Sequence, residues 1–390
     1  MAGAKERTEL ESKIQRWVNA GLIDRQAGDR ILAFEASEER TARLRWPSLL
    51  AMAFGGILFA AGITLFVAAH WGQMSPATRF SVVLLMVAVL HGGGAALAER
   101  FPAFSTTLHG VGTASLGAAI FLTAQIFNLH ENWATGILLW AVGATVGWLL
   151  LRDWVHAAFV ALLVPSWLIS QWDISTNWQW GSRKPVAVGL VLAALTYLSG
   201  RIGDQRNYAR RTLVWVGGLA LLPCVGTAIV MVADYHNDGA PVSKGMQVLG
   251  WCVAVGGPLL LAWLLRGRAA WMNLIWAAWA YGLVISASWM LTIRRNTYGR
   301  DLQATLILYC LCALGTVGLV AWGVYEKRKE RMNLGLAGFA ISVLFFYFDS
   351  FMAKLGRSLS LLILGVLCLA GGYALEMTRR KLMARMESRA

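Results

Sequence analysis

Charge is scarce in this chain of 390 residues. Lys, Arg, Asp and Glu together make up 14% of it, whereas a soluble domain of average composition carries about 25%. Hydrophobic residues supply 57%, and the mean hydropathy is +0.55. Length alone would allow two or three soluble domains, but this composition predicts a membrane protein instead.

The sequence also lacks the cysteine patterns of a disulfide framework or a zinc site. All five cysteines fall inside apolar runs, and none belongs to a CxxC pair. In lipid they behave as small hydrophobic residues, so we predict no metal and no cofactor. These cysteines are Cys224, Cys252, Cys310, Cys312 and Cys368.

Motifs of known enzymes are equally sparse. The run His91-Gly92-Gly93-Gly94 spells the oxyanion loop of some lipases, but it lies in or at the end of an apolar run, and no G-x-S-x-G elbow accompanies it. Asp153 and His156 share a helix face beside Arg152, and two ligands are too few for a metal site. We therefore predict that the protein is not an enzyme and assign no catalytic residue.

Net charge is +14, yet the sequence shows no basic patch interleaved with aromatic residues on a soluble domain. The basic residues lie in tails and in loops between apolar runs, where they orient a membrane protein and meet anionic headgroups. The expected partner is therefore the lipid bilayer, and nucleic acid is not expected.

Long apolar runs are abundant. A helix needs about 20 residues to cross a bilayer, and residues 49–70 form one such run. We predict an all-α polytopic membrane protein with about twelve transmembrane helices; the run at 185–200 is short for a span. The predicted spans are centred near residues 59, 89, 116, 142, 163, 192, 222, 256, 280, 313, 342 and 367.

The distribution of Lys and Arg predicts the orientation of these spans. With the N-terminus inside, the inner loops and tails hold most of the 35 basic residues, so both termini are expected in the cytoplasm. The predicted parts are a cytoplasmic segment 1–47, a first membrane half 48–200, a basic cytoplasmic linker 201–211, a second membrane half 212–376 and a basic cytoplasmic tail 377–390.

The N-terminal segment carries its own helical pattern. Leu10, Ile14, Trp17 and Val18 form one apolar stripe, and Gly21 is a plausible helix stop. A second short helix is expected to begin after Asp24 as its N-cap. We predict a small cytoplasmic helical hairpin, which is either a topogenic leader or a docking site for a cytoplasmic protein within residues 5–36.

Small and aromatic residues fit a tight bundle in lipid. Small residues on one helix face let helices approach closely; the predicted packing positions are Gly55, Gly62, Gly110 and Ala114. Tryptophans at predicted helix ends form an interface belt; the predicted anchors are Trp46, Trp71, Trp133 and Trp154.

Three stretches of the chain resemble one protein family. They are GGILFAAGITLFVAAHW at 55–71, GTASLGAAIFLTAQIFNL at 112–129 and LLWAVGA at 138–144. The first 150 residues are similar to the bacterial membrane-protein family called domain of unknown function 2157, with Phe127 where the family has Tyr. The stretch 346–376 resembles the end of a related multi-span family. The resemblance implies an inner-membrane location and a helical fold, and it supplies no activity.

Polar residues gather at the predicted outer ends of spans one, three and eleven. An ionisable group near lipid is costly unless it faces a cavity or a partner, so these residues are candidates for an outer vestibule that admits a small polar solute. The alternative is that they are ordinary interface residues. The candidates are His70, Gln125, Asn128, His130, Glu131 and Asp349.

Three functions stay open at this point. A transporter or channel would use the vestibule; a non-catalytic sensor or scaffold would signal through the N-terminal hairpin; an enzyme acting on a lipid-linked substrate would need a carboxylate or histidine cluster at one leaflet. A continuous polar cavity would favour transport, and a sealed, glycine-packed core would favour the sensor or scaffold.

Overall fold

The computed structural model describes most of the chain as α-helix. The described residues are 13–33, 54–55, 58, 62, 69, 71–128, 132–177, 179, 181–200, 208–233, 241–296, 302–350 and 357–388. They contain no β-strand, and the chain forms two compact units, residues 1–82 and 83–390. The all-α prediction is confirmed.

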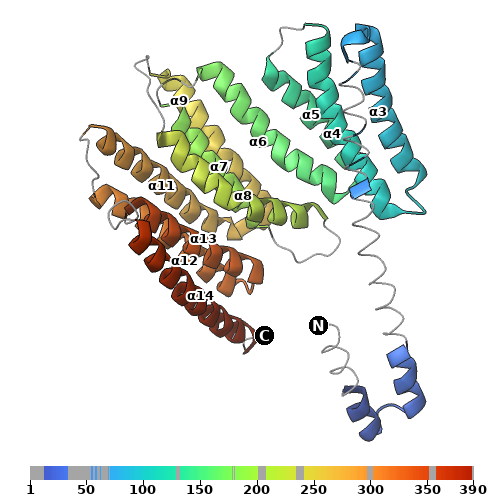
Figure 1. Cartoon of the computed structure of the whole chain (residues 1–390), viewed down its shortest axis with the longest axis vertical. Helices are drawn as coiled ribbons and strands as arrows, with labels where there is room; N and C mark the ends of the chain where they lie inside the picture. Colours follow the sequence, from blue (N-terminus) through green and yellow to red (C-terminus); the bar gives the residue numbers. More distant parts are fainter. Residues whose placement is uncertain are drawn as a thin grey trace. The chain divides into compact units, whose positions relative to one another are not determined.

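The helices follow one another with short connections (Figure 1). They are η1 (Trp71–Gln73), α3 (Pro76–Ala96), α4 (Pro102–Ile126), α5 (Trp133–Leu151), α6 (Trp154–Thr176), α7 (Arg183–Leu198), α8 (Tyr208–Ala233), α9 (Lys244–Trp251), the π-helical turn η2 (Cys252–Gly256), α10 (Gly257–Arg266), η3 (Gly267–Ala270), α11 (Trp271–Asn296), α12 (Leu302–Tyr325), α13 (Lys329–Ser350) and α14 (Arg357–Ser388).

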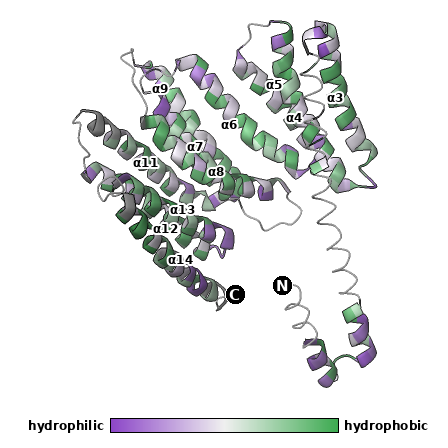
Figure 2. Cartoon of the chain, viewed as in Figure 1, coloured by the Kyte–Doolittle hydropathy of each residue, from purple (hydrophilic) through white to green (hydrophobic). Residues whose placement is uncertain are grey.

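The predicted N-terminal hairpin is present in residues 13–33. Gly21 adopts a left-handed φ of 69°, and the Leu22 N–H donates to the Trp17 carbonyl, which closes the first helix. Asp24 caps the second helix by accepting from the Ala27 N–H at 2.5 Å. Ile14 is buried against Gly28, so the two helices pack on each other. Figure 2 shows these helices as largely hydrophilic.

Nine segments of the described chain are long and apolar enough to cross a membrane. One of them, Lys244–Met290, holds two long helical stretches separated at Gly267, whose φ is 60°. The 16 residues of α7 are too few to count among the nine. The predicted span near residue 59 lies largely outside the described residues. The protein is thus a multi-pass membrane protein.

The short helix α7 lies at the centre of the second unit. Ala187, Val188, Val191 and Leu192 are completely buried, and α7 packs against α8, α10 and α11. Helix α7 therefore does not have to match the bilayer thickness, because protein surrounds it in place of lipid. This packing also joins the two predicted membrane halves, since α7 precedes the predicted linker 201–211 and α8 follows it.

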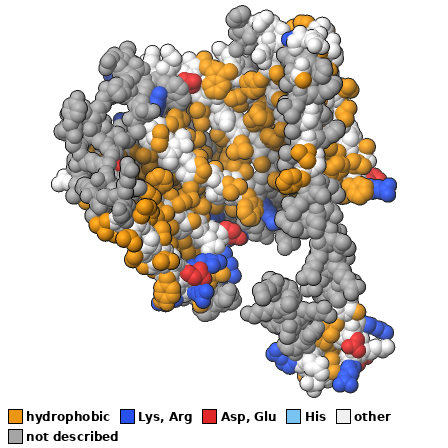
Figure 3. Space-filling view, in the orientation of Figure 1, with side chains coloured by type: hydrophobic (Ala, Val, Ile, Leu, Met, Phe, Trp, Pro, Cys, Tyr) orange, Lys and Arg blue, Asp and Glu red, His pale blue; other side chains and the backbone are white. Residues whose placement is uncertain are grey.

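The outer face of the helices is apolar, as a lipid environment requires. Leu150, Leu219, Leu264 and Leu369 are among the exposed large hydrophobic side chains. Figure 3 shows hydrophobic side chains over much of the visible face of the second unit, with Lys and Arg towards its edges. The bilayer is the environment of this surface.

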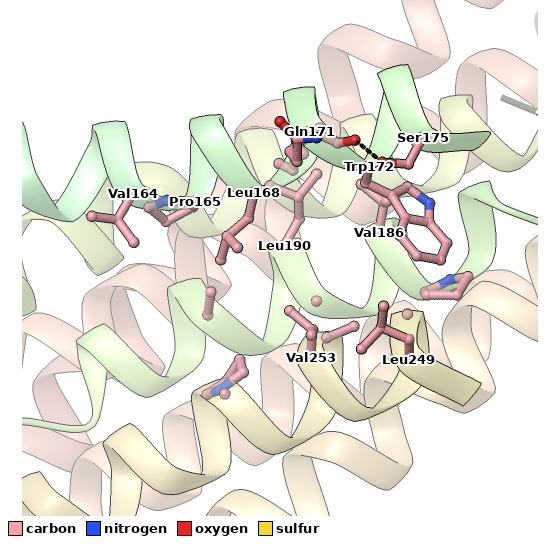
Figure 4. A pocket seen from close by; sticks show the side chains of 18 of the residues that line it. Val164, Pro165, Leu168, Gln171, Trp172, Ser175, Val186, Leu190, Leu249 and Val253 are labelled. Atoms are coloured by element: carbon pink, nitrogen blue, oxygen red, sulfur yellow. Dashed lines mark hydrogen bonds between the residues drawn. The ribbon is translucent and has the colours of Figure 1, made fainter. Parts of the chain in front are cut away.

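Two grooves between the helices are lined almost entirely by apolar residues. The first, about 430 Å³, lies between α6, α7 and the α9–α10 segment, and Figure 4 shows Leu168, Leu190 and Val253 projecting into it. Gln171 and Ser175 lie near one end of it, and the hydroxyl of Tyr197, which also lines it, donates to the Ala161 carbonyl. The second, about 560 Å³, lies between α12, α13 and α14. Neither groove forms a polar path.

Candidate functional site

Three of the six histidines converge where α3 ends, α4 begins and α6 begins. The Nδ1 atoms of His91 on α3 and His109 on α4 lie 3.0 Å apart, and the two ring centroids are 5.3 Å apart. His156 follows on the first turn of α6. We call His91, His109, Thr113, Asp153 and His156 the histidine cluster.

The two-residue turn between α5 and α6 orients His156. Arg152 ends α5 in a left-handed conformation, with a φ of 52°, and Asp153 is the N-cap of α6. The Asp153 carboxylate accepts from the His156 backbone N–H at 2.8 Å and lies 2.8 Å from Nδ1 of the His156 ring. One carboxylate therefore both starts the helix and fixes the imidazole.

The other nitrogen of His156 reaches α4. Its Nε2 lies 2.8 Å from the Thr113 hydroxyl. Because Nδ1 faces a carboxylate, Nδ1 carries the proton, and in the neutral ring Nε2 accepts from the hydroxyl. Asp153, His156 and Thr113 thus form a continuous relay across two helices.

The relay has the group order of a hydrolytic triad, carboxylate to imidazole to hydroxyl. Thr113, however, is 2% exposed, and neither apolar groove is lined by it. Its backbone carbonyl also accepts a 2.8 Å hydrogen bond from the Trp140 indole. This closed environment suits proton binding better than attack on a substrate.

The carboxylate of Asp153 is negatively charged. Burial acts to raise the pKa of Asp153, but hydrogen bonds from the side chain and the backbone N–H of His156 outweigh it, so the pKa lies below its ordinary value.

Glycines make room for the three rings. A Cβ at Gly94 would lie 2.8 Å from the His109 ring, and one at Gly112 would lie 2.9 Å from the His91 ring. A Cβ at Gly147 would clash with the His156 ring. Helix backbone therefore packs closely against each ring. His156 is completely buried and His109 is buried, whereas His91 is half-buried. The core around the cluster is glycine-packed.

The described members of the predicted vestibule lie on two helices, α4 and α13. Gln125 and Asn128 are exposed at the end of α4, which packs on α5 and α6. Asp349 is half-buried on α13, which packs on α12, α14 and α8. His70, His130 and Glu131 lie outside the described residues.

The predicted packing and anchor residues are placed as follows. A Cβ at Gly110 would lie 2.7 Å from the Val155 side chain, whereas Ala114 is exposed. No atom lies within 4 Å of a Cβ built at Gly55 or Gly62. Trp133 and Trp154 are exposed at the starts of α5 and α6. Trp46 and the side chain of Trp71 lie outside the described residues.

The sequence singles out three members of the histidine cluster and gives no reason to join them. His91 belongs to a glycine-rich run, and Asp153 and His156 form a pair at one helix turn. His109 and Thr113 complete the cluster; their segment is predicted only as a packing face through Gly110 and Ala114. The signal for them is their spacing of four on one helix face, together with the glycine that follows each of His91 and His109.

Comparison with known proteins places this cluster inside a family segment. Residues 15–157 match the family described as "Predicted membrane protein (DUF2157)", which confirms the resemblance. The matched segment contains the whole histidine cluster and most of the N-terminal hairpin. No curated protein and no solved structure matches the chain.

Proposed function

We propose, from the match of residues 15–157 to a family of predicted membrane proteins and from the chemistry enclosed in that segment, that this protein is a non-catalytic proton sensor of the bacterial inner membrane. The observation that carries the proposal is the buried histidine cluster, above all the 3.0 Å approach of His91 to His109. Ionisable residues inside membrane spans are costly and typically functional.

The histidine pair responds to protons through its hydrogen bond. Two neutral imidazoles share one proton between their Nδ1 atoms, one ring donating and the other accepting. The first added proton leaves one imidazolium that donates from Nδ1 to the neutral ring, so the hydrogen bond survives. A second proton puts hydrogen on both Nδ1 atoms, removes the acceptor and places two positive charges side by side, and the pair then separates.

Few other charged groups face the pair. The first turn of α6 contributes His156 and the turn before it Asp153, while α5 contributes no titratable residue. Asp153 is negative and lies beside the cluster, where it compensates added positive charge. We therefore expect the cluster to take up protons stepwise.

Protonation changes helix packing because the rings have no free space. Gly94 and Gly112 bring the backbones of α3 and α4 against the rings, so a ring that moves must shift a helix. Close-packed cores respond to such changes by discrete rearrangement. The signal is then a change in the packing of α3 to α6.

We assign to the N-terminal hairpin the transmission of the signal to a cytoplasmic protein. The hairpin packs on itself through Ile14 and Gly28 and still exposes Trp17, Leu22 and Ile31, which suits contact with a cytoplasmic protein. Both termini lie in the cytoplasm under this proposal, as the distribution of Lys and Arg predicts. Sensing is preferred to transport because the two grooves are apolar and because His109, Thr113 and His156 are buried.

The test is hydrogen exchange of the full chain in lipid nanodiscs between pH 8 and pH 5, with rates corrected for the intrinsic effect of pH. In the wild type, we expect protection of the α3 and α4 amides around 91–113 to fall as pH falls. The double variant His91→Gln, His109→Gln cannot take up these protons, so its protection stays constant over that range.

The matched control is His236→Gln, which changes a histidine outside the cluster and should behave as the wild type. Histidine ¹⁵N shifts in the same samples report whether the rings gain protons over the range. Protection that does not change with pH in the wild type, or changes equally in the double variant, contradicts the proposal.

A further inference from the structure

A second buried polar cluster lies where α7, α10 and α12 end and α13 begins. It consists of Arg266, Trp322, Glu326 and Arg331, and we call it the arginine cluster. Arg331 is 2% exposed and Arg266 is 7% exposed. Buried arginines at membrane helix ends are costly unless their charge is compensated.

Glu326 is the shared acceptor of this cluster. Its carboxylate pairs with Arg266 through one oxygen and with Arg331 through the other, and it accepts from the Trp322 indole N–H at 2.8 Å. Burial acts to raise the pKa of Glu326, but the hydrogen bond from Trp322 and the charge of Arg331 hold the pKa below its usual value. Glu326 is therefore one negative charge between two positive ones.

Each of the three side-chain nitrogens of Arg331 has a hydrogen-bond acceptor. Its Nε donates to the Leu198 carbonyl at 3.1 Å, and its Nη2 lies 3.3 Å from the Gly200 carbonyl. Both carbonyls belong to the end of α7, where the helix dipole is negative. The guanidinium carbon also lies 4.1 Å from the centre of the Trp322 ring.

Arg266, in contrast, lacks acceptors for two of its nitrogens. Among the described residues, only its Nη2 has a hydrogen-bonding partner, Glu326, and its buried Nε and Nη1 have none. The Trp322 ring, 5.3 Å from the guanidinium carbon, offers a partial cation–π contact. The described cluster thus holds an excess of one positive charge and two buried donors without acceptors, a combination that proteins rarely keep.

The position of the arginine cluster at the ends of membrane helices indicates which kind of ligand would supply the missing acceptors. Arg266 is the last residue of α10, and Glu326 lies in the turn between α12 and α13, both at the ends of membrane segments. The exposed Arg268 and the half-buried Arg328 lie in the same two connections. Basic pockets between membrane helices at this level suit phospholipid headgroups.

We propose that Arg266 binds the phosphate group of an anionic phospholipid at this end of the helices. A phosphate supplies several acceptor oxygens and one negative charge, which satisfies the free donors and the excess charge together. The Nε and Nη1 atoms of Arg266 are buried. The phosphate therefore reaches them only when the Arg266 side chain moves away from the Trp322 ring. Arg331 and Glu326 keep their pairing during this movement.

The experiment compares thermal unfolding of the full chain in nanodiscs of pure phosphatidylcholine and of phosphatidylcholine with phosphatidylglycerol. A lipid that binds only the folded state raises the midpoint, so the wild type should gain several degrees with phosphatidylglycerol. Arg266→Gln should lose that gain. In pure phosphatidylcholine it should unfold no earlier than the wild type, because it removes the excess positive charge and Glu326 keeps its pairing with Arg331.

The matched control is Arg268→Gln, which removes an exposed basic residue two positions away and should keep the gain. Arg266→Lys, which keeps the charge without the guanidinium fork, should keep only part of it and serves if Arg266→Gln does not fold. Inorganic phosphate added to phosphatidylcholine nanodiscs identifies the source: a gain equal to that of phosphatidylglycerol would assign the site to soluble phosphate and overturn the lipid. A gain in Arg266→Gln as large as in the wild type would overturn the site itself.

Discussion

Asp153 shows how one side chain serves two structural purposes. It caps α6 through the His156 N–H and holds the His156 ring through Nδ1. The lowered pKa of Asp153 means that the carboxylate stabilises the fold most above its ordinary value of 3.8. That contribution is lost as pH falls through the lower folded-state value, because the protonated acid no longer pairs with His156.

Two substitutions of Asp153 separate its role as the N-cap of α6 from its role as the charged partner of the His156 ring. Asp153→Asn keeps a good N-cap and loses the charge, whereas Asp153→Ala loses both, so we expect the alanine variant to be less stable by about 1 kcal/mol more. Thermal unfolding across pH 2 to 6 should be flatter for Asp153→Asn than for the wild type. Parallel pH profiles of wild type and Asp153→Asn would refute the coupling.

At the scale of elements, the tightest helix pair is α7 with α8. Gly217 of α8 faces the α7 backbone, and a Cβ there would lie 2.6 Å from the Ala194 carbonyl and would clash with the Leu198 N–H. A flexible side chain could move aside for such a Cβ, but the backbone of a packed helix cannot. The neighbouring Gly218 has room, since its Cβ would lie 3.8 Å from Leu198.

These two glycines give a matched prediction. Gly217→Ala should destabilise the protein by about 1 to 3 kcal/mol, because overpacking forces the two helices apart. Gly218→Ala should be neutral or stabilising by up to about 1 kcal/mol, because alanine is the better helix former. Denaturation of each variant in the same detergent measures the difference in stability between them. Equal effects of the two substitutions would contradict the close packing of Gly217 against the α7 backbone.

The sequence predicted most elements but not the role of α7. Hydropathy identified a run at 185–200 and marked it as short for a span, which agrees with the 16 residues of the helix. Periodicity cannot tell whether neighbours or lipid cover such a run, because both are apolar. Likewise, the histidine cluster needs contacts between residues 18 and 43 positions apart, which no local pattern contains.

At the scale of the whole molecule, orientation depends on charge outside the helices. The positive-inside rule predicts an even number of spans with both termini in the cytoplasm. Under this prediction, the histidine cluster and the arginine cluster both lie towards the cytoplasmic ends of their helices. We expect protonation to report cytoplasmic pH.

This orientation can be tested with fusions. A fluorescent protein that folds only in the cytoplasm should be bright at either terminus, and alkaline phosphatase, which needs an oxidising compartment, should be inactive at both. Single cysteines in the loops 201–207 and 234–240, in a variant without the native cysteines, should label from opposite sides. Active phosphatase at either end would reverse the predicted topology.

Composition and hydropathy by themselves determined that this chain is a helical membrane protein with many spans, because the cost of burying polar backbone in lipid leaves few alternatives. They also located the N-terminal hairpin, since its caps and its apolar stripe are local. Only the tertiary structure brought His91, His109 and His156 together and left Arg266 short of acceptors. Both depend on which helices pack side by side, and an apolar sequence pattern is the same whichever neighbour it meets.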